Sequence, residues 1–353
     1  MERTATVIFV CFFVVTSTFA QQTIPYRVTE NLADETIGIL PESTYISQNF
    51  DDVSVLEYYF LTYPFNDQSL LTLERGTGVL KTARAIDREE YCAYEQFCYL
   101  DATVSILQGL EPVTSVTLRI LLDDENDSEP FFQDANIVIS VSEAATVGST
   151  RSLPVAQDMD SPANGVDTSA YELQSSSQIP FRVDYVSDEL LLILTDQLDR
   201  EQIATYTFAV TAYDAGSPRL SSSLNVTVRV TDFNDHAPVF QQLLYDVTVL
   251  ENYAVGLELV RVNATDLDIG SNGEVTYAFA DFTEVAYGDV FNMDAVSGSL
   301  SLAAELNYET NAFYILEVVA RDGSPEPKES TATVQIQVFD VNDNRPRVSA
   351  DMM

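Results

Sequence analysis

The fold is decided by an acidic motif that occurs three times along the chain, as Asp124-Glu-Asn-Asp-Ser-Glu-Pro130, Asp232-Phe-Asn-Asp-His-Ala-Pro238 and Asp340-Val-Asn-Asp-Asn-Arg-Pro346. The first aspartates of successive copies are 108 residues apart in both cases. Self-similarity at a fixed period is the signature of tandem structural repeats. The motif therefore predicts three units of similar size that follow one another along the chain.

Other short motifs keep the same order and nearly the same period. The recurring pieces are a lone Glu (Glu30, Glu143, Glu251), Asp-Arg-Glu (87–89 and 199–201, with Asn-Tyr-Glu at 307–309), Asp-x-Asp (158–160, 266–268) and a lone Asp (Asp214, Asp322). Five motifs in one order at near-constant spacing exclude chance as an explanation.

The segments between the motifs alternate apolar and polar residues, as at 206–211, 224–231 and 334–338. Alternation with a period of two places one face of a strand in the core. Clusters of Gly, Ser, Pro and Asn separate these segments, and no helical periodicity is visible. We therefore expect an all-β chain in which each unit is a β-sandwich.

The composition excludes several classes of function. Asp and Glu number 55 against 17 Lys and Arg, which gives a net charge of −38. Nucleic acid and anionic lipid both require a basic face, so neither is an expected partner. The chain has one histidine, His236, which argues against a His-rich zinc site or a His-based triad.

Residues 1–20 have the form of a secretory signal peptide. Arg3 precedes an apolar stretch at residues 7–15, and small residues precede a cleavage point after Ala20. A signal anchor is the alternative, but so short an apolar stretch cannot span a bilayer. No later apolar run of about 18 residues follows. We expect an exported chain, and its abrupt end suggests a fragment whose C-terminal membrane anchor is missing.

Cys11 lies in the predicted signal peptide, which leaves Cys92 and Cys98 in the mature chain. Secretion favours a disulfide between them, with two free thiols as the alternative. In an extended chain their Cα atoms would lie about 20 Å apart, whereas a disulfide needs about 5.5 Å. We therefore expect residues 93–97 to fold back as a loop.

Each Asp-x-Asn-Asp motif places two carboxylates three residues apart. Such close like charges raise each other's pKa unless a cation lies between them, and hard oxygen ligands select calcium. Calcium takes about six to eight oxygens, so we expect ligands from several segments at the ends of adjoining sandwiches. Most of the remaining Asp and Glu residues are expected to be surface residues that keep the protein soluble. An enzyme with paired carboxylates would need one unique pair, whereas here the pairs recur, so we expect no enzyme.

The order of these motifs resembles the extracellular cadherin repeat, over essentially all of residues 21–348. The resemblance implies three tandem Greek-key, immunoglobulin-like β-sandwiches in an extended rod. It divides the chain into a signal peptide (1–20) and three repeats (21–130, 131–240 and 241–348). It also implies about three calcium ions in each linker between repeats, which stiffen the linker.

The resemblance assigns ligands residue by residue. In the first linker the carboxylates are Glu30, Asp87, Glu89, Asp124, Asp127, Asp158, Asp160 and Asp214, with backbone oxygens from Glu125, Asn126 and Asn164. In the second linker they are Glu143, Asp199, Glu201, Asp232, Asp235, Asp266, Asp268 and Asp322, with backbone oxygens from Phe233, Asn234 and Asn272. Glu251, Glu309, Asp340, Asp343 and Asn344 would form half of a further site.

The chain departs from the family pattern at three positions. Ser128 and His236 stand where the family usually has Asn, which predicts a weaker ion site beside each. Asn307 stands where the family has Asp. For His236 we expect a solvated linker residue rather than a zinc ligand.

The Cys-x5-Cys spacing directly after Asp87-Arg-Glu89 looks like the first repeat of protocadherins. The chain lacks Trp, so it cannot adhere by docking an N-terminal Trp, as classical cadherins do. The resemblance implies calcium-dependent cell–cell adhesion at the cell surface, by homophilic binding to the same protein on an apposed cell. The alternatives are binding to another cadherin and a soluble or heterophilic ligand or receptor ectodomain.

Asn225-Val-Thr and Asn263-Ala-Thr are glycosylation sequons in an exported chain, and we expect both to carry glycans. Asn126-Asp-Ser also fits the sequon but lies inside the acidic linker, where a glycan would block metal binding. We therefore expect Asn126 to be unmodified.

Overall fold

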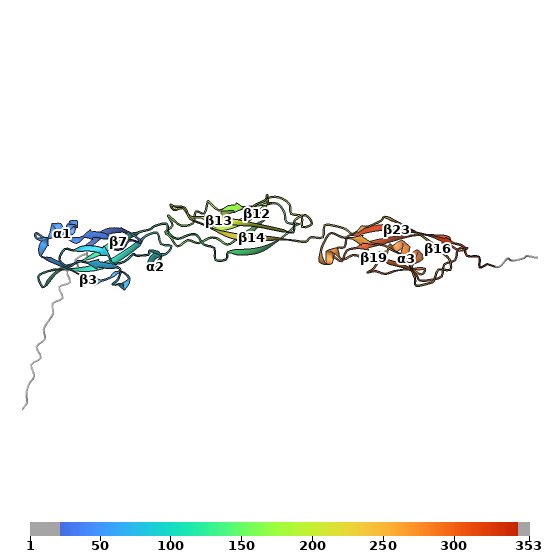
Figure 1. Ribbon diagram of the computed structural model, residues 1–353, viewed down its shortest axis with the longest axis horizontal. Coiled ribbons are helices and arrows are strands. Elements are labelled where there is room, and N and C mark those ends of the chain that lie inside the picture. Colours follow the sequence, from blue (N-terminus) through green and yellow to red (C-terminus); the bar gives the residue numbers. More distant parts are fainter. Residues whose placement is uncertain (1–21, 345–353) are drawn as a thin grey trace, which may run out of the picture.

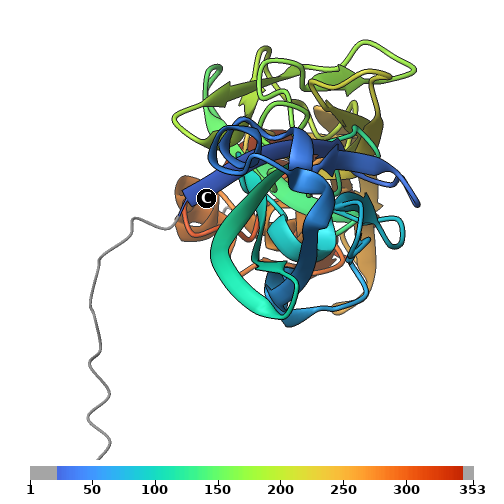
Figure 2. The ribbon, with the colours of Figure 1, turned by 90° about the vertical axis from the view of Figure 1, so that its left-hand side faces the viewer.

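The computed structural model describes residues 22–344. The predicted signal peptide with Cys11, and Pro346 of the third acidic motif, lie outside these residues. The described chain forms three β-sandwiches that follow one another in an extended rod (Figure 1). Figure 2 looks along the rod and shows the sandwiches one behind another. The predicted tandem sandwich architecture is confirmed, while the boundaries assigned to the repeats remain a prediction.

Sandwich 1 contains seven strands, which are β1 (Gln22–Thr29), β2 (Thr36–Ile39), β3 (Leu56–Thr62), β4 (Leu71–Leu73), β5 (Val79–Thr82), β6 (Cys98–Gln108) and β7 (Glu111–Asp123). They form two sheets with the orders β1-β7-β6-β3 and β2-β5-β4. The first strand lies parallel to the last, and all other neighbours are antiparallel.

Sandwich 2 repeats this topology with β8 (Asn136–Ser142), β9 (Thr150–Leu153), β10 (Glu172–Gln174), β11 (Phe181–Val186), β12 (Glu189–Leu194), β13 (Thr205–Tyr213) and β14 (Ser221–Thr231). Its sheet orders are β10-β13-β14-β8 and β11-β12-β9. The first and last strands are again the parallel pair.

Sandwich 3 has the same plan, in the sheet orders β16-β23-β22-β19 and β17-β21-β20, with a small added sheet of β15 and β18. Its strands are β15 (Val239–Phe240), β16 (Leu244–Leu250), β17 (Glu258–Arg261), β18 (Ala264–Thr265), β19 (Thr276–Phe279), β20 (Phe291–Met293), β21 (Ser299–Leu302), β22 (Phe313–Arg321) and β23 (Glu329–Phe339). Three copies of one topology follow from three copies of one sequence pattern.

Alternation along the strands builds a separate core in each sandwich. In β14, Leu224, Val226 and Val228 are fully buried, while Asn225 between the first two is exposed. The strands predicted at 206–211, 224–231 and 334–338 all lie within observed strands. The buried apolar residues form three distinct clusters, one in each sandwich, so each sandwich has the core of an independent folding unit.

The sequence analysis did not anticipate three short helices: α1 (Thr44–Asn49), α2 (Glu89–Cys92) and α3 (Asp281–Tyr287). Four short 3-10 helices are also present within the described chain, at Leu40–Glu42, Val53–Val55, Pro64–Asn66 and Gly270–Gly273. None is longer than two turns, so none produces a helical period that could be recognised in the sequence. Within residues 22–344, no helix has the length and apolar character needed to cross a bilayer.

The core of sandwich 3 offers a direct test of this packing. Leu316 on β22 is fully buried, whereas its neighbour Ile315 is 47% exposed. We expect Leu316→Ala to lower the free energy of unfolding of sandwich 3 by about 3 kcal/mol, because it leaves a cavity. Ile315→Ala is the matched control and should change it by less than about 0.5 kcal/mol. Urea unfolding of both variants measures this, and equal effects would contradict the assigned register.

Candidate metal centres between the sandwiches

We call the contact between sandwiches 1 and 2 the first junction and that between sandwiches 2 and 3 the second junction. The parallel pairing of first and last strands brings two acidic segments to the same end of each sandwich. In sandwich 1, Thr29 at the end of β1 pairs with Asp123 at the end of β7. Glu30 and Asp124 therefore leave the sheet side by side. Ser142 and Thr231 place Glu143 and Asp232 in the same way.

A buried glutamate organises this end of each sandwich. Glu30 is fully buried and accepts hydrogen bonds from the backbone N–H of Arg88 (2.7 Å) and of Glu125 (2.6 Å). The same two bonds recur in the later copies, with Glu143 accepting from Arg200 (2.7 Å) and Phe233 (2.6 Å), and Glu251 from Tyr308 (2.8 Å) and Val341 (2.7 Å). Each glutamate ties the Asp-x-Glu turn to the acidic linker.

Two groups of carboxylates meet at the first junction. Oxygens of Glu30, Glu89 and Asp124 lie within 4.8 Å of one another. Glu89 also belongs to a second group with Asp127 and Asp160, again within 4.8 Å. Asp160 comes from sandwich 2 and the other residues from sandwich 1, so the second group spans the junction.

The second junction repeats this arrangement. Glu143, Glu201 and Asp232 form one group within 4.8 Å, and Glu201, Asp235, Asp268 and His236 form the other. His236 Nδ1 lies 2.7 Å from Asp235 Oδ1 and 3.2 Å from Asp268 Oδ1. The imidazole thus contacts carboxylates on both sides of the junction, while its side chain remains 36% exposed to solvent. At the end of sandwich 3, Glu251, Glu309 and Asp343 form a single group without a partner sandwich within the described chain.

Buried oxygens without a hydrogen-bond partner show where a cation fits. Among the described residues, ten buried side-chain atoms have no partner, and six of these lie at the junctions. They are Oδ1 of Asn126 and Oδ2 of Asp158 and Asp160 at the first junction, and Oε2 of Glu201, Oδ1 of Asn234 and Oδ2 of Asp266 at the second. All six atoms are oxygens, and a hard divalent cation such as calcium prefers oxygen ligands of this kind. From the sequence we expected only the backbone oxygens of Asn126 and Asn234 to act as ligands, and the role of their side chains was missed.

The other predicted ligands surround these groups. Asp214 accepts Asn126 Nδ2 at 2.9 Å, and Asp322 accepts Asn234 Nδ2 at 3.0 Å, so each orients an asparagine whose Oδ1 has no partner. Asp87 and Asp199 accept backbone N–H groups of their own turns. Asn164 and Asn272 donate their side-chain amides to Asp124 (2.7 Å) and Asp232 (2.9 Å).

Asp124 also ties the two sandwiches together. It accepts the backbone N–H and the hydroxyl of Ser161 in sandwich 2, at 3.0 and 2.6 Å, and pairs with Arg88 at 2.9 Å. Arg200 occupies the place of Arg88 at the second junction and lies 2.5 Å from Asp232. Neither arginine was identified from the sequence as part of the site. Their recurrence between Asp and Glu in the repeated motif was the available signal.

Burial makes these carboxylates costly to ionise. Burial, and then the charge of Asp158, raise the pKa of Asp160 to about 7. Burial and the charge of Glu30 raise the pKa of Glu89 to about 8. At the second junction, burial raises the pKa of Glu201 and of Asp268. A divalent cation at either junction removes this cost by neutralising the carboxylates.

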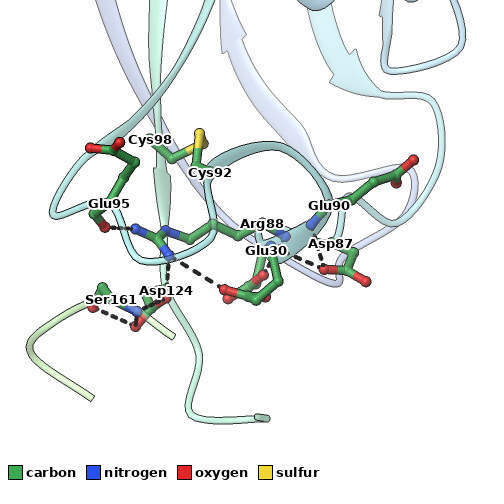
Figure 3. The surroundings of a disulfide bond; sticks show 10 residues. Glu30, Asp87, Arg88, Glu90, Cys92, Glu95, Cys98, Asp124 and Ser161 are labelled. Atoms are coloured by element: carbon green, nitrogen blue, oxygen red, sulfur yellow. Dashed lines mark hydrogen bonds and ion pairs between the residues drawn. A yellow bond between two sulfur atoms is a disulfide. The ribbon is translucent and has the colours of Figure 1, made fainter. Parts of the chain in front are cut away.

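The predicted disulfide is present, with 5.6 Å between the Cα atoms of Cys92 and Cys98. Residues 93–97 fold back as a loop beside Glu30 and Asp124 (Figure 3).

Asn225 and Asn263 are exposed, so both remain candidates for glycosylation. Asn126 Nδ2 is engaged by Asp214 and by the Pro218 carbonyl, which supports the expectation that Asn126 is unmodified.

A family model described as the cadherin domain matches residues 137–231 and 245–339. The chain belongs to the cadherin family. Cadherin domains bind calcium, in agreement with the carboxylate-rich groups at the junctions. The number of ions and their ligands remain predictions.

Protocadherins are among the relatives that this cadherin matches. Human protocadherin gamma-A5 is 37% identical over 284 residues, which cover 79% of this chain and 29% of the relative. Protocadherin-11 X-linked from Pan paniscus is 35% identical over 297 residues, which cover 82% and 22%. The chain therefore spans less than a third of the length of these relatives.

Solved protocadherin ectodomains have the same architecture as this cadherin. The structure of mouse clustered protocadherin gamma C3 EC1–3 aligns with a TM-score of 0.79 at 27% identity, covering 90% of this chain and 100% of that one. Extracellular cadherin domains 1–5 of protocadherin gamma B2 align with a TM-score of 0.77 at 28% identity, covering 91% and 59%. The predicted protocadherin-like membership is confirmed. Protocadherins are adhesion proteins, so the prediction that the chain is not an enzyme is also confirmed.

The raised pKa of Asp160 gives a pH dependence that is visible when divalent cations are chelated. The folded-state pKa is about 7, above the unfolded value of about 3.9, so ionising Asp160 costs stability as the pH rises through this window. Asp160→Asn cannot ionise. We expect its unfolding midpoint in chelator to exceed that of the wild type at about pH 8 and to approach it near pH 4. Thermal melts at both pH values check this, and a pH-independent difference would contradict the assignment.

Proposed function

We propose that this cadherin mediates calcium-dependent cell–cell adhesion, as the N-terminal part of a cell-surface ectodomain that binds the same protein on an apposed cell. The observation that carries the calcium dependence is the pair of carboxylate-rich groups that span the junctions. One joins Glu89 with Asp127 and Asp160, and the other joins Glu201 with Asp235, His236 and Asp268. Because each group contains residues from two sandwiches, binding of an ion would depend on how the two sandwiches are oriented relative to each other.

The chain's own residues explain how such coupling works. Glu30 and Glu143 hold the acidic linkers in place, because their carboxylates accept the backbone N–H hydrogen bonds described above. Asp158 and Asp160, and likewise Asp266 and Asp268, present carboxylates from the next sandwich. Calcium bound between the two sides would neutralise carboxylates that otherwise repel one another. Repulsion without the ion favours bending, and a bound ion favours the straight rod.

Homophilic binding is supported by the protocadherin relationship. Three repeats are present, and we propose that they supply part of the adhesive surface. A heterophilic or soluble ligand built on the same rod is the second candidate. Both candidates use the same calcium-dependent junctions, so they differ only in the partner.

Calcium should stabilise the chain. At a calcium concentration 100 times Kd, each independent site adds about 2.7 kcal/mol, so the unfolding midpoint should rise by several degrees relative to chelator. In Gly216→Ala the new Cβ would collide with Asn126 Oδ1, so calcium affinity at the first junction should fall. Gly76 has open space around it, which makes Gly76→Ala the matched control. Calorimetric titration of both variants measures this, and unchanged affinity in Gly216→Ala would remove Asn126 from the site.

Homophilic adhesion should appear in a bead assay. Beads coated with the described repeats should aggregate in millimolar calcium and disperse in chelator, because the straight rod presents the adhesive surface. Asp160→Ala and Asp268→Ala remove one carboxylate from each junction and should shift aggregation to higher calcium concentrations. Dispersed beads despite calcium-stabilised protein would exclude homophilic binding by these repeats and favour a heterophilic ligand.

A further inference from the structure

The loop closed by the disulfide, residues 92–98, contacts the next sandwich directly. The backbone N–H of Tyr94 donates to the carbonyl oxygen of Met159 at 3.1 Å. Met159 lies between Asp158 and Asp160 in sandwich 2, at the centre of the first junction. Tyr94 has a φ of 66°, in the left-handed region that non-glycine residues rarely occupy. The closed loop holds the residue in this conformation and so aims its N–H across the junction.

Arg88 connects the same loop to the acidic linker. Its side chain is only 1% exposed, and its guanidinium pairs with Asp124 and donates to the carbonyl oxygen of Glu95 within the loop (Figure 3). A buried cation with these two partners fixes the loop relative to the linker. The loop, Arg88 and Asp124 therefore form one connected unit on the sandwich 1 side.

Among residues 22–344, the second junction has no such loop and makes the equivalent contact differently. Leu267 is the counterpart of Met159, 108 residues later, between Asp266 and Asp268. Its carbonyl oxygen accepts a hydrogen bond from Arg200 Nη2 at 2.8 Å. The same backbone carbonyl is thus bound by an arginine side chain at the second junction and by the loop backbone at the first, where Arg88 is turned inward to the loop instead.

We propose that the Cys92–Cys98 loop is a metal-independent brace of the first junction, in which the Tyr94 N–H replaces the arginine donor used at the second. The Tyr94–Met159 hydrogen bond joins two backbone groups and involves no ion, so it persists when calcium is removed. Opening the disulfide lets residues 93–97 extend, and Tyr94 then loses both its backbone conformation and its partner. The first junction thereby depends on the oxidation state of the loop, whereas the second does not.

Single-molecule energy transfer on the full three-repeat chain tests this, with dyes attached through unnatural amino acids so that the disulfide stays intact. The exposed residues Leu110 and Val186 report on the first junction, and Val186 and Val296 report on the second. In chelator, we expect Cys92→Ser/Cys98→Ser to raise the ratio of bent to straight first junctions about fivefold, which matches the loss of one hydrogen bond. The distribution across the second junction should not change.

Two controls separate a brace from general destabilisation. A thiol reductant opens the loop of the wild-type protein without any substitution. In chelator, this treatment should raise the ratio of bent to straight first junctions as the serine variant does, even if the serine variant folds poorly. Arg200→Lys should loosen the second junction and leave the first unchanged. An unchanged first junction after opening the disulfide, or equal loosening of both junctions, would overturn the proposal. Because all measurements are made without calcium, this outcome is independent of whether calcium drives adhesion.

Discussion

Consecutive sandwiches bury carboxylates between them, and this burial governs how the junctions are built. Glu30, Asp160 and Asp214 are almost completely buried, although ionised carboxylates are normally kept in water. Part of the cost is met by backbone N–H groups, as at Glu30 and Asp214, and part by the arginines of the repeated motif. The buried oxygens of Asp158 and Asp160 still have no hydrogen-bond partner, and a divalent cation is the ligand that fits them.

The sandwich topology makes this crowding possible. Because the first and last strands of each sandwich are parallel neighbours, both deliver their acidic C-terminal extensions to the same end. A purely antiparallel pairing of these strands would place the lone Glu and the Asp-x-Asn-Asp motif at opposite ends. The rigid core behind each pair keeps the carboxylates in position, so the junction is preorganised by the fold even though its charges repel.

The two junctions are built on one plan but differ in detail. Ser128 at the first junction corresponds to His236 at the second, and only the histidine adds a ring nitrogen to the carboxylate group. The arginine of the repeated motif points into the disulfide loop at one junction and across to the next sandwich at the other. Repetition of sequence therefore gave repetition of topology, while single substitutions and one added loop made the junctions chemically distinct.

The resemblance of the repeated motifs to the cadherin repeat indicated the acids that gather at the junctions. The sequence pattern itself predicted the period, the sandwich class and the strands at 206–211, 224–231 and 334–338. These depend on local alternation and on repeated spacing, both of which can be read within a short window. Only the tertiary structure decided which oxygens lack partners, where the arginines point and what the Tyr94 N–H binds. Those properties depend on residues far apart in the chain, such as Asn126 and Asp214, which are 88 positions apart. Hydrogen-bond satisfaction is a property of the folded surroundings, so the motifs and their resemblance to the cadherin repeat predicted which residues meet but not which of their atoms are left without a partner.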